Sequence, residues 1–505
     1  MDRKRRGYTD KKSAVMISLP SPFSKDDSSS YFNMKNINTV FGVKHARVAL
    51  IFVVILFLAA CVYLSFSPSN DDRFRIPKGK CPKLSFRPRD DVQVEPFRID
   101  LKSQDWITKE CFNGNPPTDV DNIFSSLHIW AQSMDSICRK LFNDFGSVYQ
   151  VREKTAEVTL SETFMVKVKG WLKDNAELIE KTKKQTLVFV DNLYTQESVV
   201  FNSVRSRRPG ASGGDSTDLL KDMLEKSAKD CDFCKFKEMT AQDSFGILES
   251  KHAAIVSNAF KIEKFHGMIL LKQHDPSQFT LTQFLDAMSL ASKWYDKVHS
   301  LVPDYNFRHM YWDVYPRASA SQVHPHLHIL LGNGEYYAKW NHLHISALRY
   351  PHRNYGANYW QVMVEAHHSI GLAVQFGDAV ALGYITPQKD YCTFVISRKP
   401  GLDFFKMVYF VYKAFIEDLK LYAYSSGFVF PKMKTKPENE DKELPALFSI
   451  VYRGSLAGSR SDISSFDLFG TANVNSSPYK VIAAIRSSVE KRKDEKYEID
   501  ELGFQ

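Results

Sequence analysis

Residues 323–331 read Val-His-Pro-His-Leu-His-Ile-Leu-Leu, and this stretch decides how the rest of the chain is interpreted. Its three histidines, His324, His326 and His328, alternate with apolar residues. In an extended strand, alternate side chains point to the same face, so the pattern predicts a strand that presents three imidazoles together. Three imidazoles in an apolar setting are costly to bury unless a ligand, a metal ion or a phosphate uses them. The stretch therefore predicts a working site.

Two cysteines and a fourth histidine lie upstream of this triad. Cys231-Asp-Phe-Cys234 is a CxxC pair, and His274 lies fifty residues before His324. The thiolates of such a pair can share one metal ion, although the same spacing also serves redox chemistry. The alternative is two unpaired cysteines that pack as small apolar residues.

The triad resembles that of the histidine triad superfamily, in the His-Pro-His form of the galactose-1-phosphate uridylyltransferase branch. The resemblance implies an α+β fold of two half-domains whose antiparallel sheets are flanked by helices. It also implies that His326 attacks the α-phosphorus of a nucleotide to form a nucleotidyl-histidine intermediate, and that His328 assists. A neutral imidazole is a good nucleophile near pH 7, which makes this chemistry reasonable on physical grounds.

The same resemblance assigns a metal site and a phosphate site. Its zinc ligands match Cys231, Cys234, His274 and His324, which implies a structural Zn²⁺ without an open coordination position. Its Arg-x-x-Arg-Pro segment resembles Arg205-Ser-Arg-Arg208-Pro, and guanidinium groups suit phosphate oxygens. Ser321 matches a phosphate-contacting serine. The residues expected to bind substrate are Arg205, Arg208, Ser321, Gln322 and Asp313.

Three positions depart from the family pattern. His328 stands where the transferases usually have glutamine, and Ser319 stands where a glycine is usual. Asp313 replaces an asparagine or glutamine near the phosphate, and a carboxylate repels phosphate unless it is protonated or paired. Three functions therefore stay open: a membrane-anchored nucleotidyltransferase or nucleotide-sugar phosphorylase, a nucleotide hydrolase, and a catalytically altered, zinc-braced binding protein. The expected substrate is a nucleotide sugar or a dinucleotide.

Residues 48–66 contain no charged side chain. Nineteen helical residues span a hydrocarbon core of about 30 Å, so the segment predicts a single transmembrane helix. The basic residues before it favour a cytoplasmic N-terminus, hence a type II membrane protein with its body in the lumen of the endoplasmic reticulum or Golgi. Cys81, Cys111, Cys138 and Cys392 remain, compatible with two disulfides or with four reduced thiols.

The 505 residues are enough for a two-part globular body with appendages. The net charge of +9 suits a polyphosphate ligand or an acidic membrane surface, and no basic-aromatic array indicates nucleic acid. A homodimer is a further expectation. The expected organisation is a disordered tail (1–47), a transmembrane helix (48–66), a stem and helical region (67–189), a first half-domain with the zinc site and triad (190–335), a second half-domain (336–487) and a charged tail (488–505).

Overall fold

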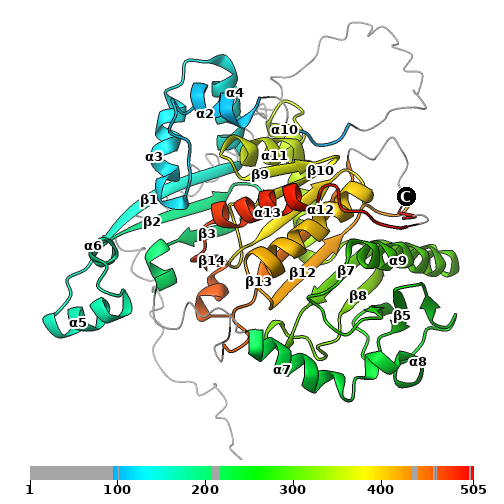
Figure 1. Cartoon of the computed structure of the whole chain (residues 1–505). Helices are drawn as coiled ribbons and strands as arrows, with labels where there is room; N and C mark the ends of the chain where they lie inside the picture. The colour runs from blue at the N-terminus through cyan, green and yellow to red at the C-terminus, as the bar shows by residue number, and fades with distance from the viewer. Residues whose placement is uncertain are drawn as a thin grey trace, which may run out of the picture. The chain divides into compact units, whose positions relative to one another are not determined.

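The structure, a computed structural model, describes residues 95–99, 102–207, 217–434, 442–458, 461, 463–499 and 502–504 (Figure 1). These residues form two sheets flanked by helices. The predicted α+β class is confirmed for this part of the chain, and the strands pair antiparallel except that β3 (Ser198–Phe201) and β14 (Thr471–Val474) are parallel.

The larger sheet has ten strands, each antiparallel to its neighbours. In spatial order they are β4 (Leu248–Glu249), β5 (Ala253–Ser257), β6 (Phe265–Leu271), β8 (His326–Asn333), β7 (Tyr305–Asp313), β12 (Tyr424–Val429), β13 (Ala446–Tyr452), β11 (Thr393–Ser397), β10 (Ala379–Gly383) and β9 (Ala373–Phe376). Strands β5, β10 and β11 are buried at every residue, as short apolar runs in the middle of a sheet predict.

The sheet is built from two halves with the same strand order. The first half reads β4-β5-β6-β8-β7 and the second reads β9-β10-β11-β13-β12, so the halves meet where β7 pairs with β12. Helix α9 (Leu281–Leu301) joins β6 to β7, and α12 (Leu402–Lys413) takes the same place between β11 and β12. The topology is repeated although the sequence shows no repeat.

The second half has no histidine triad in the matching position. A proline precedes both β8 and β13, and the residues that then correspond to the three histidines are Leu444, Ala446 and Phe448. All three are buried and apolar. The histidine triad is therefore found only in the first of these two halves of the sheet.

Helices pack against the sheet and supply much of the core. Helix α9 begins with a capping box in which the Thr280 side chain and Gln283 each satisfy a backbone N–H of the first turn. Helix α12 is almost wholly buried, and α13 (Pro478–Arg492) contacts both α12 and β10. Helices α10 (Ala338–Arg353) and α11 (Tyr359–Ser369) connect the two halves of the sheet in sequence.

A smaller four-stranded sheet has the order β1-β2-β3-β14, with bounds β1 (Tyr149–Glu157), β2 (Lys184–Asn192), β3 (Ser198–Phe201) and β14 (Thr471–Val474). The helices near it in sequence are α2 (Gln104–Glu110), α3 (Val120–Ala131), α4 (Ser136–Val148), α5 (Glu162–Trp171), α6 (Ala176–Lys183) and α7 (Thr217–Ala228).

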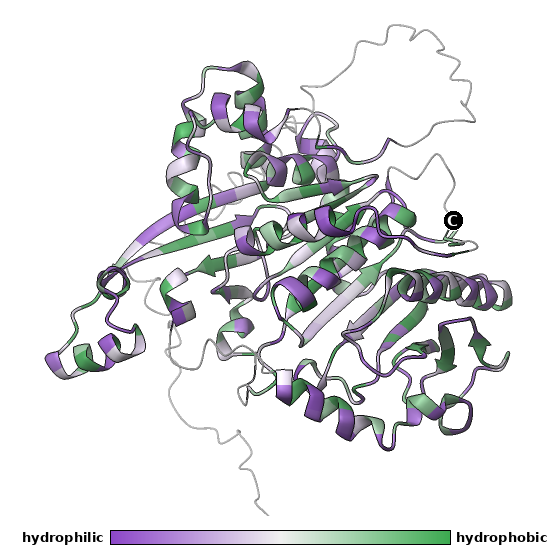
Figure 2. Cartoon of the chain, viewed as in Figure 1, coloured by the Kyte–Doolittle hydropathy of each residue, from purple (hydrophilic) through white to green (hydrophobic). Residues whose placement is uncertain are grey.

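The predicted stem and helical region, 67–189, contains helices and also the strand β1. This strand is largely hydrophilic (Figure 2) and pairs with β2 along its whole length. Arg152 crosses to Asp191 at 2.5 Å and lies over the Phe189 ring, so cross-strand contacts stabilise a segment whose own composition does not favour a strand.

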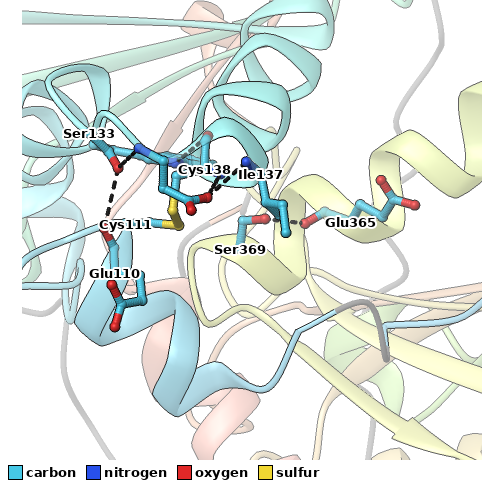
Figure 3. Close-up of a disulfide and its surroundings, with 9 residues drawn as sticks. Glu110, Cys111, Ser133, Ile137, Cys138, Glu365 and Ser369 are labelled. Atoms are coloured by element: carbon cyan, nitrogen blue, oxygen red, sulfur yellow. Dashed lines mark hydrogen bonds between the residues drawn. A yellow bond between two sulfur atoms is a disulfide. The ribbon is translucent and has the colours of Figure 1, made fainter.

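One disulfide joins α2 to α4. Cys111 and Cys138 are bonded, and nearby the Ser133 hydroxyl donates to the carbonyl of Glu110 (Figure 3). Cys392 is a buried free thiol, and Cys81 lies outside the described residues. The sequence was compatible with two disulfides or with four reduced thiols. Neither holds as stated, because Cys111 and Cys138 are bonded whereas Cys392 is a free thiol.

The predicted single-pass membrane arrangement needs correction. Within the part of the chain that the structure describes, no helix is both long enough and apolar enough to cross a bilayer. The expected span, residues 48–66, lies outside the described residues, as do residues 1–47. The type II arrangement with a lumenal body is therefore not supported, and no anchor enters the proposed function.

Candidate active site and metal centre

The histidine triad lies where β8 begins, in the middle of the first half of the sheet. His326 is the first residue of β8 and lies opposite Leu270 of β6, while His328 lies between Met268 of β6 and Tyr311 of β7. His324 comes two residues before the strand. His324 and His326 are buried, and His328 is half-buried. Strand pairing on both sides holds His328, and pairing with β6 holds His326.

A Cys2His2 cluster that can hold a metal ion lies directly beside the triad. Its members are Cys231, Cys234, His274 and His324, and their ligand atoms all lie within 4.8 Å of one another. The Cys234 sulfur is 3.4 Å from Nδ1 of His274 and 3.5 Å from Nδ1 of His324, and the Cys231 sulfur is 3.6 Å from the latter nitrogen. The structure thus brings together all four residues that the sequence predicted as ligands.

Hydrogen bonds orient both imidazoles toward the centre of this cluster. Nε2 of His324 donates to the carbonyl of Leu271 at 2.6 Å, and Nε2 of His274 donates to the Ser227 hydroxyl at 2.9 Å. Each ring therefore keeps its lone pair on Nδ1, the atom that faces the sulfurs. Tetrahedral zinc sets sulfur and nitrogen ligands about 3.5 Å apart, so the donor set fits that ion.

The two cysteines are placed by a short helical turn. Cys231 precedes η4 (Asp232–Lys235), and the N–H of Cys234 donates to the carbonyl of Cys231. Phe233, between them, has its ring centroid 5.1 Å from that of His326. The turn that would bind the metal therefore also packs on the middle histidine of the triad.

His326 has one ring nitrogen committed and one available. Its Nδ1 donates to the carbonyl of His324 at 2.7 Å, so the lone pair resides on Nε2. Burial lowers the pKa of His326, although the bond to His324 and the charge of Asp313 oppose that effect. A neutral imidazole with a free Nε2 is the form that attacks phosphorus.

A further histidine, not identified from the sequence, orients His328. The N–H of Ile262 donates to Nδ1 of His266, so Nε2 of His266 carries the proton and donates to Nδ1 of His328 at 2.9 Å. His328 is thereby left with its proton on Nε2. Burial lowers the pKa of His328 to about 3 and that of His266 to about 4, so both are neutral donors near pH 7. The Tyr311 ring stacks on His328 at 4.3 Å.

Asp313 has partners that the sequence did not reveal. Its carboxylate accepts a hydrogen bond from the Ser425 hydroxyl at 2.5 Å, and Nη1 of Arg453 donates to that hydroxyl at 2.8 Å. Burial raises the pKa of Asp313, while Ser425 and the charge of Arg453 lower it. Both partners lie on the second half of the sheet, more than a hundred residues further along the chain, where no local pattern identifies them.

The segment between β7 and β8 has a strained backbone. Tyr315 has φ 68° and ψ 159°, a region that glycine alone adopts freely, and Ser319 is left-handed with φ 77° and ψ 9°. Ser321 is exposed and Gln322 half-buried in the same segment. A glycine at position 319 would suit this left-handed conformation better than serine does, because glycine has no Cβ.

Replacing Ser319 with glycine is expected to stabilise the protein by about 1 kcal/mol, because glycine has no Cβ to clash in the left-handed region. Urea denaturation of Ser319→Gly measures the change. Ser319→Ala is the matched control, since alanine keeps the Cβ and gains nothing. A glycine variant no more stable than the alanine variant would contradict the assigned conformation.

The predicted phosphate-binding arginines are described only in part. Arg205 is exposed in η3 (Ser203–Arg207), and Arg208 lies outside the described residues. The contacts of these two arginines with phosphate stay a prediction, and so do the phosphate contacts of Ser321 and Gln322.

No protein-family model matches the chain, and no curated protein matches it in sequence. Several solved structures do resemble it. An ADP-glucose phosphorylase from Arabidopsis thaliana is 12% identical, with 59% of this chain and 98% of that chain covered and a TM-score of 0.45. A uridylyltransferase is also 12% identical, covering 50% of this chain and 90% of its own at a TM-score of 0.41. A yeast Ap4A phosphorylase is 12% identical, with 70% and 93% covered and a TM-score of 0.27.

These likenesses are distant. Among the structures that resemble the chain are a galt-like protein, a uridylyltransferase and two phosphorylases, one of ADP-glucose and one of Ap4A.

Proposed function

We propose that the protein is a nucleotidyltransferase or nucleotide-sugar phosphorylase that works through a nucleotidyl-histidine intermediate. The observation that carries this proposal is the pair of ring orientations in the triad. His326 offers a lone pair on a buried Nε2, and His328 offers a proton on its own Nε2. A nucleophile and a hydrogen-bond donor are therefore fixed on one strand, two residues apart.

In this mechanism Nε2 of His326 attacks the α-phosphorus of the donor, and its Nδ1–H remains bonded to the carbonyl of His324. The Nε2–H of His328 donates to a non-bridging phosphate oxygen or to the leaving oxygen, where negative charge grows. Arg205, Arg208, Ser321 and Gln322 hold the phosphates. A phosphate or sugar phosphate then attacks the phosphorus and regenerates free His326.

A zinc ion held by Cys231, Cys234, His274 and His324 would supply structural bracing rather than a reacting water. His324 connects the two sites, because its imidazole is a ligand while its carbonyl accepts the His326 proton. Holding the His324 ring therefore holds the group that orients the nucleophile.

The second candidate is a nucleotide hydrolase, and the observation that favours it is His328 itself. The transferases to which the motif is similar usually have glutamine there, whereas a histidine can also exchange protons with water. The same covalent intermediate would form, and water would be its acceptor.

One experiment separates these candidates. The purified protein is incubated with ADP-glucose or Ap4A labelled at the α-phosphorus, and the protein is then assayed for acid-labile label on histidine. Label released only when phosphate or a sugar phosphate is added supports the transferase or phosphorylase. Label released by water alone supports the hydrolase. Absence of label with every donor would leave the zinc-braced binding protein. The expected homodimer stays a prediction.

A further inference from the structure

Asp313 ends β7 and His326 begins β8, on neighbouring strands of the larger sheet. Strands β7 and β8 pair with Tyr311 opposite His328, and the same register continued by two residues sets Asp313 opposite His326. Residues opposite each other in an antiparallel pair present their side chains to the same face. The mutual influence of the two charges on their pKa values agrees with this placement.

The hydrogen bonds around Asp313 run in one direction. Arg453 donates to Ser425, and Ser425 uses its single hydroxyl proton to donate to Asp313. A guanidinium has donors only, so the bond from Arg453 to Ser425 cannot be reversed. The carboxyl oxygen is therefore an acceptor, and the chain of bonds favours the ionised form of Asp313. Ser425 lies opposite Asp313 in the β7·β12 register, which fixes this contact at the junction of the two halves.

The covalent step changes the charge of the His326 ring. When Nε2 bonds to the α-phosphorus, the bond from phosphorus to the leaving oxygen breaks and its electron pair stays on that oxygen. The Nδ1 proton remains bonded to the carbonyl of His324, so the imidazole becomes an imidazolium. His326 is only 3% exposed, and water therefore does little to stabilise the new positive charge.

We propose that Asp313, held by Ser425 and Arg453, stabilises the nucleotidyl-imidazolium of His326 and thereby favours the covalent intermediate. This role rests on the proposed function. This role would explain why a carboxylate stands at position 313, where the families that the motif resembles usually have an amide.

The same charge has an opposite effect on the bound donor. Before attack, the His326 ring is neutral and the carboxylate repels the phosphates, which weakens donor binding. During attack, the ring gains charge and the attraction to the carboxylate grows. Asp313 therefore raises both the half-saturating donor concentration and the rate of the chemical step.

Asp313→Asn separates these two effects, because asparagine keeps the shape and a carbonyl oxygen for Ser425 but has no charge. We expect the first-order rate of adduct formation to fall by about 10- to 100-fold, while the half-saturating donor concentration falls by about 3- to 10-fold. A merely structural role would not lower both quantities together.

Single-turnover kinetics of adduct formation test this with two donors, ADP-glucose and the activated compound adenosine 5′-phosphorimidazolide. Ser425→Ala, which keeps the charge but removes its donor, is expected to reduce the rate by less than Asp313→Asn does. Ser426→Ala is the matched control. Ser426 is the next residue on β12, its hydroxyl hydrogen-bonds with Tyr412 on the opposite face, and its loss is expected to leave both constants unchanged.

The outcomes are distinct. If the activated donor labels wild-type protein and Asp313→Asn reacts as fast or faster, the inference is overturned while the proposed function stands. If the activated donor gives an adduct but ADP-glucose does not, ADP-glucose is excluded as a substrate. The kinetics with the activated donor then decide the role of Asp313. If neither donor labels His326 in wild-type protein, both proposals are overturned.

Discussion

His326→Ala protein is expected to lose nucleotidyl transfer by at least about 10³-fold, because alanine removes the nucleophile and the covalent intermediate cannot form without it. The variant should still fold and still bind zinc, since the four proposed ligands are untouched. The measurement is the steady-state rate with ADP-glucose and phosphate, together with mass spectrometry of the trapped adduct, in which the mass increase of one nucleotidyl group should vanish.

The matched control is His352→Ala, in which an exposed histidine near the end of α10 is removed from the second half of the chain. Its rate and its adduct should equal those of wild-type protein. If His326→Ala keeps more than about a tenth of the wild-type rate, covalent catalysis by this residue is excluded, and a direct transfer to the acceptor would have to replace it.

Half of the metal cluster could be predicted from a local pattern in the sequence. Cys231 and Cys234 share one helical turn, so the CxxC spacing alone indicated a possible metal-binding pair. His274 and His324 were added by resemblance, and the structure sets their Nδ1 atoms 3.4 Å and 3.5 Å from the Cys234 sulfur. Short-range geometry of this kind survives in the sequence even where overall similarity is low.

The partners of the triad could not be predicted, because they depend on which strands become neighbours. His266 reaches His328 since β6 pairs with β8, and Ser425 reaches Asp313 since β12 pairs with β7. Strand order in a ten-stranded sheet is decided by the packing of the whole fold, which leaves no periodicity around the individual residue. For this reason Asp313 looked like an unpaired carboxylate in the sequence and is a paired one in the structure.

Strand β1 was not identified from the sequence for a related reason. Its sequence, Tyr-Gln-Val-Arg-Glu-Lys-Thr-Ala-Glu, has few of the apolar residues that mark a strand, and it follows a helix with clear helical periodicity. Pairing with β2 decides the conformation, and β2 is itself more apolar. Pairing with β2 outweighs the low strand propensity of β1, and the local sequence does not show which strand will be its partner.

Removing the proposed zinc is expected to cost the protein its fold rather than only its activity. Elemental analysis should find one zinc per chain. Without the metal, two thiols and two imidazoles would face one another in a partly buried cluster, and burial raises the pKa of the Cys234 thiol to about 11, so this thiol would be neutral near pH 7. Because such a site forms only in the folded chain, the free energy of zinc binding adds to the free energy of folding. We therefore expect Cys231→Ser, Cys234→Ser protein to melt at least about 10 °C lower than wild type, if it folds at all.

Cys392→Ser provides the control for this prediction, because Cys392 is a buried free thiol on the second half of the sheet and is no member of the cluster. That variant should keep one zinc per chain and should lose only the stability that a buried thiol contributes, about 1 to 2 kcal/mol. The loss of nucleotidyl transfer should follow the loss of zinc, since the His324 ring would hold the metal while its carbonyl accepts the His326 proton. A double variant that folds with the wild-type melting temperature would show that the fold does not depend on a metal at this cluster. The proposed link between zinc and the nucleophile would then be wrong.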